Sequence, residues 1–138
     1  MVDALSMAVK IAGSGLRAQS TRMRIVAENL ANVESTGNTP GAEPYARKTI
    51  TFEGAMNKAN LGGEVKIRAI GVDESPFRVE LRPGHPAADE NGYVKLPNVD
   101  PLIEMADLKD ANRAYQANLQ AIKQARELVA MTLDLLKG

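Results

Sequence analysis

Few side chains in this sequence have the chemistry for catalysis or metal binding. His85 is the only histidine and there is no cysteine, so a transition-metal site would lack the imidazole and thiolate ligands that such sites combine. The absence of cysteine also excludes disulfides and cysteine nucleophiles. His85 follows Arg82-Pro83-Gly84, and we interpret it as a turn residue. No metal or cofactor is expected.

Two pairs of adjacent carboxylates, Asp73-Glu74 and Asp89-Glu90, are the candidates for acid–base chemistry. Each pair is expected on a loop as solvated charge, whereas acid–base catalysis requires a sheltered pair with separated pKa values. Gly62-Gly63 and Gly13-x-Gly15 lack the strand–turn–helix context and the third glycine of a dinucleotide site. The serines lack the base and the sequence context of a nucleophile. The sequence therefore predicts a protein that is not an enzyme.

The charge distribution does not identify a partner. Seventeen basic residues balance seventeen acidic ones, which leaves no net field to attract nucleic acid or an anionic membrane. Tyr45, Tyr93 and Tyr115 are too few and too scattered to form a base-stacking platform. The N-terminal segment lacks the basic and continuous apolar regions of a cleaved signal peptide, and no apolar run is long enough to span a bilayer. Neither nucleic-acid binding nor membrane insertion is expected.

The two ends of the sequence predict long amphipathic helices. Apolar residues in 2–33 recur at alternating steps of three and four, interrupted only by Gln19, which is typical of a coiled-coil seam. Residues 101–138 carry a similar, less regular stripe. Asp100-Pro101 opens this second helix with a capping carboxylate and with a proline at the first helical position. Each helix therefore has an apolar surface that requires a partner.

Two glycines weaken the first predicted helix. Gly13 and Gly15 each cost about 1 kcal/mol relative to alanine in a helix interior. Two explanations stay open: a tolerated kink, or small residues that allow another backbone to approach closely. The dense turn-forming residues of 35–41 end the helix by about residue 35.

The middle of the chain, residues 44–96, predicts three or four short strands. Apolar and polar residues alternate there in short runs bounded by glycine, proline and asparagine. The alternating runs are 46–52, 65–69, 77–81 and 93–96. Residues 53–63 are expected to be a mobile connection between two of these strands.

The sequence divides into three predicted parts. These are an N-terminal coiled-coil helix at 1–34, a β-rich middle region with loops at 35–100, and a C-terminal coiled-coil helix at 101–138. The first helix would extend about 48 Å at 1.5 Å per residue, longer than a compact domain of this size buries against itself. The pattern therefore points to assembly. The side chains expected at the assembly interface are Leu5, Val9, Leu16, Met23, Val26, Leu30, Asn32, Met105, Leu108, Asn112, Tyr115, Leu119, Ile122, Val129, Leu133 and Leu136.

Specific sequence strings resemble those of the flagellar rod and hook proteins. Residues 15–33 (GLRAQSTRMRIVAENLANV) resemble the N-terminal motif of that family, and residues 104–118 (EMADLKDANRAYQAN) look like its C-terminal partner motif. Between them, residues 44–48 (PYARK), 83–89 (PGHPAAD) and 92–100 (GYVKLPNVD) are similar to a proximal rod component of the family. The resemblance covers nearly the whole chain.

The resemblance implies an α+β fold, with long N- and C-terminal helices paired as an antiparallel coiled coil and a small β-rich insertion between them. It implies a structural subunit of the proximal rod in the bacterial flagellar basal body, part of the drive shaft that transmits torque from motor to hook. It also implies export through the flagellar type III apparatus without a cleaved signal, and no small-molecule substrate. The implied partners are other rod subunits, further copies of this chain and the adaptor at the rod base.

A second interpretation remains open on the residues alone. The two helices could close on each other in a self-contained helical hairpin, whose β-rich part captures a peptide or protein ligand. Such a module would be fully ordered as a dilute monomer, whereas a rod subunit would have labile ends.

Overall fold

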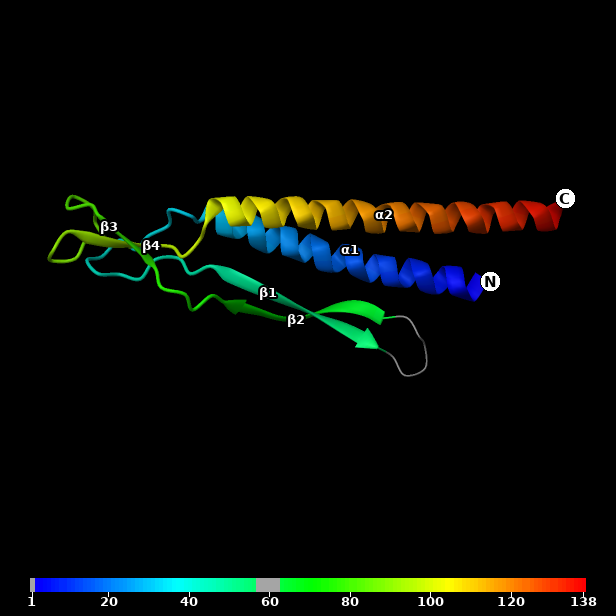
Figure 1. Cartoon of the computed structure of the whole chain (residues 1–138), viewed down its shortest axis with the longest axis horizontal. Helices are drawn as coiled ribbons and strands as arrows, with labels where there is room; N and C mark the ends of the chain where they lie inside the picture. The colour runs from blue at the N-terminus through cyan, green and yellow to red at the C-terminus, as the bar shows by residue number, and fades with distance from the viewer. Residues whose placement is uncertain (1, 57–62) are drawn as a thin grey trace. The chain divides into compact units, whose positions relative to one another are not determined.

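The computed structural model describes residues 2–56 and 63–138 and confirms the predicted α+β fold with two long terminal helices (Figure 1). The first helix is α1 (Val2–Ala31) and the second is α2 (Pro101–Lys137). The described strands form two separate two-stranded sheets, β1–β2 and β3–β4. The strands are β1 (Lys48–Met56), β2 (Gly63–Val72), β3 (Arg78–Leu81) and β4 (Tyr93–Leu96).

The chain forms two compact units. The first unit consists of Met1–Met23, Thr51–Ala69 and Lys109–Gly138, and the second of Arg24–Ile50 and Ile70–Leu108. Each long helix contributes to both units. The division of the sequence into parts at residues 34 and 100 stays a prediction.

Local sequence signals account for the helix ends in the second unit. The backbone N–H of Leu102 donates a hydrogen bond to Asp100 Oδ1 at 3.0 Å, so the predicted N-cap of α2 is confirmed. At the other helix, the Asn32 amide donates to the Glu28 carbonyl at 2.8 Å, and its oxygen accepts a hydrogen bond from the Ser35 hydroxyl at 2.9 Å. The backbone N–H groups of Asn32 and Val33 donate to the carbonyls of Asn29 and Leu30 at 3.2 and 3.4 Å, which satisfies groups that the end of α1 would leave free. The helix therefore stops within the predicted limit.

The helices pair in an antiparallel manner in each unit. In the first unit, the side chain of Asn118 lies directly over the backbone of Gly15. In the second unit, Asn29 donates a hydrogen bond to Glu104. Each contact is of the kind expected for the predicted pairing of the two helices.

The strands agree with the alternating runs of the sequence, with one correction. The predicted strand 93–96 has the same bounds as β4. However, β1 continues to Met56, so residues 53–56 are strand and the prediction of a mobile connection there was wrong. The rest of that predicted connection, 57–62, lies outside the described residues, and Gly63 begins β2. A polar residue at Glu53 did not end the strand because strands accept polar residues on a solvent-facing side.

The second unit has a small core beside β4. Ala87, Ala88, Val94 and Leu96 form a buried apolar cluster. Val94 and Leu96 alternate with the exposed residues Tyr93 and Lys95, as the period of a half-buried strand requires. Within β3, by contrast, Val79 and Leu81 are both exposed.

Candidate assembly interface

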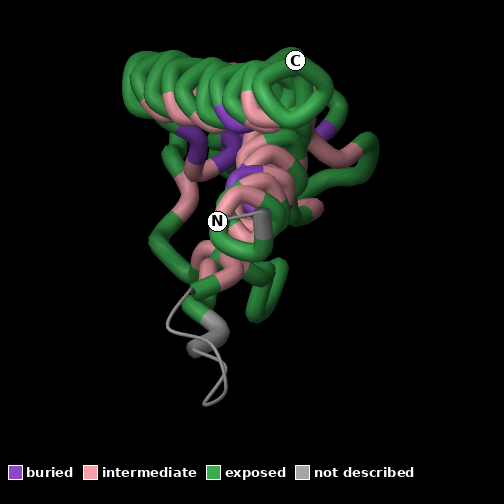
Figure 2. The backbone as a smooth tube through the Cα atoms, turned by 90° about the vertical axis from the view of Figure 1, so that its right-hand side faces the viewer, coloured by how far each residue is buried: buried purple, intermediate pink, exposed green. Residues whose placement is uncertain are grey.

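The inward side of α2 carries small and polar residues at heptad spacing. Its buried residues are Glu104, Ala111 and Ala125. Asn118 completes this seven-residue series and is half-buried. A second series at the same spacing consists of large apolar residues, and all of them are half-buried: Leu108, Tyr115, Ile122 and Val129. The helix therefore buries little large apolar surface within the chain, and Figure 2 shows most of its length as exposed.

Several large apolar side chains of α2 are exposed to solvent. Leu102, Leu135 and Leu136 are 78%, 82% and 79% exposed. The other exposed large apolar residues of the helix are Ile103, Met105, Leu128, Met131 and Leu133. Exposed apolar surface of this extent on one helix is typical of a protein–protein contact.

The structure separates the predicted interface residues of α2 into two groups. Leu108, Tyr115, Leu119, Ile122 and Val129 are half-buried, whereas Met105, Asn112, Leu133 and Leu136 are exposed. Leu108, Tyr115, Ile122 and Val129 of the predicted stripe are also the half-buried series on the inward side of α2. The other predicted residues, such as Met105 and Asn112, each follow a residue of the buried series by one position. The exposed members therefore do not pack within the chain, and their role at an assembly interface stays a prediction.

The predicted interface residues of α1 are more covered. Val26 is buried. The others are half-buried, namely Leu5, Val9, Leu16, Met23, Leu30 and Asn32. The residues of α1 with the least exposure include positions outside the predicted seam, namely Ser14, Ala18, Ile25 and Asn29. The first helix is therefore buried on more than one side.

Asn29 is the centre of a buried polar network in the second unit. Its amide nitrogen donates to the Lys48 carbonyl at 2.9 Å and to Glu104 Oε2 at 3.3 Å. Its oxygen accepts from the Tyr45 hydroxyl at 2.7 Å and from the Lys48 backbone N–H at 2.9 Å. The side chain thus makes the four hydrogen bonds that an amide allows. It joins the end of α1 to the start of β1 and to the first turn of α2.

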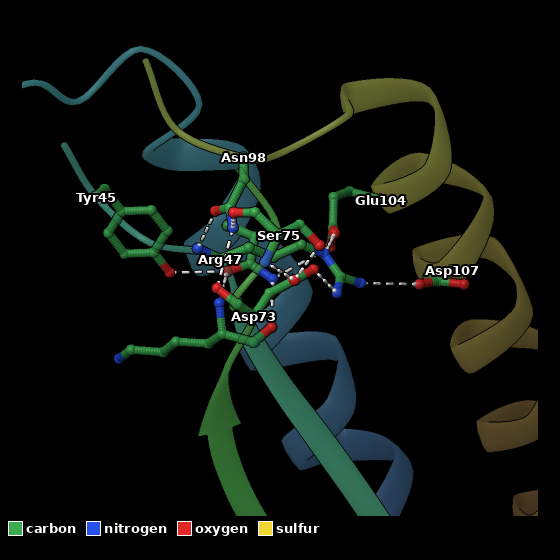
Figure 3. Close-up of polar contacts among 9 residues, drawn as sticks. Tyr45, Arg47, Asp73, Ser75, Asn98, Glu104 and Asp107 are labelled. Carbon is green, nitrogen blue, oxygen red and sulfur yellow. Dashed lines mark hydrogen bonds and ion pairs between the residues drawn. The ribbon is translucent and has the colours of Figure 1, made fainter. Parts of the chain in front are cut away.

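Glu104 is fully buried and is held by Arg47 as well as by Asn29. The Arg47 guanidinium contacts Glu104 through Nε, Asp73 at 3.4 Å and Asp107 at 3.8 Å, and Figure 3 shows it among these carboxylates. A buried carboxylate requires such a partner because an unpaired charge is expensive to remove from water. This arrangement holds segments that are distant in sequence in place.

Asp73 belongs to a structured turn, so the expectation of a solvated carboxylate pair was wrong for this residue. Its Oδ1 accepts hydrogen bonds from the hydroxyl and the backbone N–H of Ser75. These two bonds, with the Arg47 guanidinium, lower the pKa of Asp73 below its usual value. Asn98 donates to the backbone carbonyls of Asp73 and Ser75 at 3.0 Å, which fixes the same turn.

His85 occupies a turn, as predicted. Its backbone N–H donates to the Arg82 carbonyl at 3.0 Å, and its Nδ1 accepts from the Ala87 N–H at 3.0 Å. In 2–56 and 63–138, no group of three or more histidine, aspartate or glutamate side chains has the arrangement to hold a metal ion. Neither α1 nor α2, over its described residues, has an apolar stretch that could cross a membrane.

Sequence reasoning missed the polar network of Asn29, Arg47 and Glu104. In the sequence, Glu104 is simply a charged residue of the helix predicted at 101–138, and Arg47 is a polar residue of the alternating run 46–52. A heptad count that starts from Glu104 reaches Ala111, Asn118 and Ala125, and this regularity is the signal that could have revealed the inward side of α2.

Comparisons with known proteins agree with the two sequence strings at the helices. A family model described as "Flagella basal body rod protein" matches residues 10–42, and one described as "Flagellar basal body rod FlgEFG protein C-terminal" matches residues 90–135. The chain is 60% identical over 137 residues to the flagellar basal-body rod protein FlgC of Agrobacterium fabrum, which covers 99% of each chain. It is 39% identical over 125 residues to FlgC of Salmonella typhimurium, covering 91% of this chain and 92% of the relative. It is 34% identical over 151 residues to FlgC of Borreliella burgdorferi, covering 97% and 99%.

Proposed function

The chain belongs to the FlgC family of flagellar basal-body rod proteins and is a structural component of the rod, and we propose that it joins the rod through its two terminal helices, with the exposed apolar residues of α2 at the contact. The single observation that supports this route is the distribution of side chains on α2. Its buried positions are a glutamate and two alanines, whereas its large apolar residues are half-buried or exposed.

A helix with this distribution gains most of its stability from neighbours. Burying apolar surface contributes about 25 cal/mol per Å², and a fully buried leucine contributes about 2 kcal/mol. Leu102, Leu135 and Leu136 gain almost none of this within the chain. In an assembled rod, contact with adjacent subunits would supply it. We therefore propose that the helices reach full order on assembly, as parts of a shaft that transmits torque.

The neighbours in this proposal are other rod subunits, further copies of the chain and the adaptor at the rod base. No catalysis is proposed, since the polar network around Arg47 holds elements together. Export through the flagellar type III apparatus, without a cleaved signal, is part of the same proposal. It predicts that the exported chain keeps its N-terminus and that its secretion stops when the export apparatus is removed.

The self-contained binding module is the alternative. The antiparallel contacts of α1 with α2 are compatible with it. The exposed leucines at the end of α2 favour the rod, because a module that is complete by itself would gain by burying them.

Leu136→Asp tests the proposed route of assembly. Leu136 is 79% exposed, so this change should alter the stability of the isolated chain by no more than about 0.5 kcal/mol. In a rod, the new charge would lie in an apolar contact, and incorporation and motility should be lost. Gln124→Asp, at an exposed polar position of the same helix, is the control and should incorporate normally. Thermal unfolding of the isolated chains and the amount of each variant in purified basal bodies would be measured. Normal incorporation of Leu136→Asp would contradict the proposal.

A further inference from the structure

The two glycines at the middle of the first unit have different environments. A Cβ atom on Gly15 would lie 2.7 Å from Asn118 Nδ2 and 2.9 Å from Asn118 Cγ, closer than such contacts occur. A Cβ on Gly13 would lie 3.9 Å from Arg17 Nη1, an ordinary contact. Gly15 therefore makes room for the side chain of Asn118, whereas one of the two explanations offered by the sequence was the close approach of another backbone. Gly13 has no such role.

The Gly15 contact distinguishes one alignment of the helices from its nearest competitors. Sliding α1 along α2 by one heptad restores the same faces to contact, so a regular seam alone discriminates weakly against such a slip. After a slip in either direction, Ala8 or Arg22 would stand opposite Asn118. Both have a Cβ where Gly15 leaves room for the amide. Only the observed register leaves room for the Asn118 amide in the conformation that it adopts here.

Two residues near Gly15 also favour one particular placement of α1 over maximal stability. Ser14 Oγ accepts a hydrogen bond from the Val65 backbone N–H at 3.0 Å and donates one to the Ile11 carbonyl at 2.7 Å. This side chain ties α1 to β2 and opposes its rotation. One turn later, the Gln19 side-chain oxygen is buried with no hydrogen-bond partner in the described chain. A polar group in such a position lowers stability, as register-setting polar residues in coiled coils do.

We propose that Asn118 seated on Gly15 is a register lock, which selects one alignment of α1 on α2 and so determines which apolar side chains face the neighbouring subunits. The consequence for assembly rests on the proposed function, in which those outward faces make the rod contacts. The lock itself is a property of the single chain. A slip of one heptad would move α1 along α2 by about 10 Å, which would change the partner of every outward residue.

Asn118→Ala is the main test, because it removes the amide without adding a clash. The chain has no cysteine, so spin labels on cysteines introduced at the exposed positions Lys10 and Lys109 would be unique. These positions are well separated along the helix axis in the observed register, so a slip changes the distance between them by nearly its full length. We expect the wild-type chain to give a single label-to-label distance. Asn118→Ala should add a second population shifted by about 10 Å. Asn112→Ala, at an exposed asparagine of the same helix, should keep the single distance.

The glycine variants give an independent test. Gly15→Ala puts a Cβ against Asn118 in the observed register as in the slipped ones, so it should add the shifted distance and reduce incorporation into rods. Gly13→Ala should keep the single wild-type distance and normal incorporation. A wild-type distance distribution in Asn118→Ala, or in Gly15→Ala, would overturn the lock. The two proposals can fail separately, because they are measured in different ways. If Leu136→Asp incorporates normally, the rod contacts lie elsewhere, and the label-to-label distances still test the register lock.

Discussion

At the scale of single residues, the buried polar groups of the second unit are paired with unusual completeness. Asn29 has a partner for each donor and each acceptor of its amide, and Glu104 has both Arg47 and Asn29. Such groups are costly when any one partner is missing, because the remaining group keeps its desolvation penalty. The network therefore specifies the positions of three segments that are distant in sequence.

Arg47→Met should be strongly destabilising. It leaves Glu104 buried without its cation, which costs about 3 kcal/mol, at the lower end of the range for broken buried pairs because Asn29 still donates to the carboxylate. Glu104→Gln in the same chain removes the charge, and the double variant should lose less stability than the sum of the single variants. Urea unfolding would measure all three.

The control for this cycle is Arg113→Met, at an exposed position of α2. It should change the free energy of unfolding by no more than about 0.5 kcal/mol. Additive losses for Arg47→Met and Glu104→Gln would show that the two side chains do not depend on each other.

At the scale of the elements, α2 has two sides with different compositions. The inward side places Ala111, Asn118 and Ala125 one heptad apart, and the side chain of Asn118 lies against Gly15 of α1. The outward surface carries the exposed leucines and methionines. An amphipathic helix usually buries its large apolar residues. The reversed distribution is understandable if the outward surface is buried by other subunits.

Ala111→Leu should be destabilising because Ala111 is fully buried on the inward side of α2. The three additional carbons have no space there, and overpacking of this kind costs about 1–3 kcal/mol. Ala117→Leu is the matched change at an exposed position and should have little effect on the isolated chain. Thermal unfolding of both variants would be compared. Equal stability would mean that the inward side of α2 is loosely packed.

At the scale of the whole molecule, stability should be unevenly distributed. In residues 120–137, Ala125 is the one buried residue, whereas Val94 and Leu96 of β4 are fully buried. Local opening is easiest where few apolar contacts must be broken. The end of α2 is thus expected to be the least stable helical segment in a dilute solution of the chain.

Hydrogen exchange on the dilute chain checks this expectation residue by residue. Amides in 120–137 should exchange at least about tenfold faster than those of β4, which corresponds to a difference of about 1.4 kcal/mol in the free energy of opening. In assembled rods the difference should disappear. Equal protection of both segments in the dilute chain would favour the self-contained binding module.

The sequence by itself determined the classes and most limits of the elements. Heptad spacing predicted both helices, Asp100-Pro101 located the start of α2, and alternation predicted the strands, because each signal is a local property of backbone geometry. Strings of residues also indicated the family, which the comparisons confirm.

Only the tertiary structure decided which side of α2 faces α1. A search for helical periodicity follows the large apolar residues, and the predicted stripe therefore placed Met105 and Asn112 in the seam. In the structure, the buried residues are Glu104 and Ala111 instead. The choice depends on contacts that local spacing does not encode. Arg47 compensates the charge of Glu104, and Gly15 makes room for Asn118. Pairing and steric fit between residues distant in sequence are properties of the folded chain, and they determine which apolar residues remain exposed.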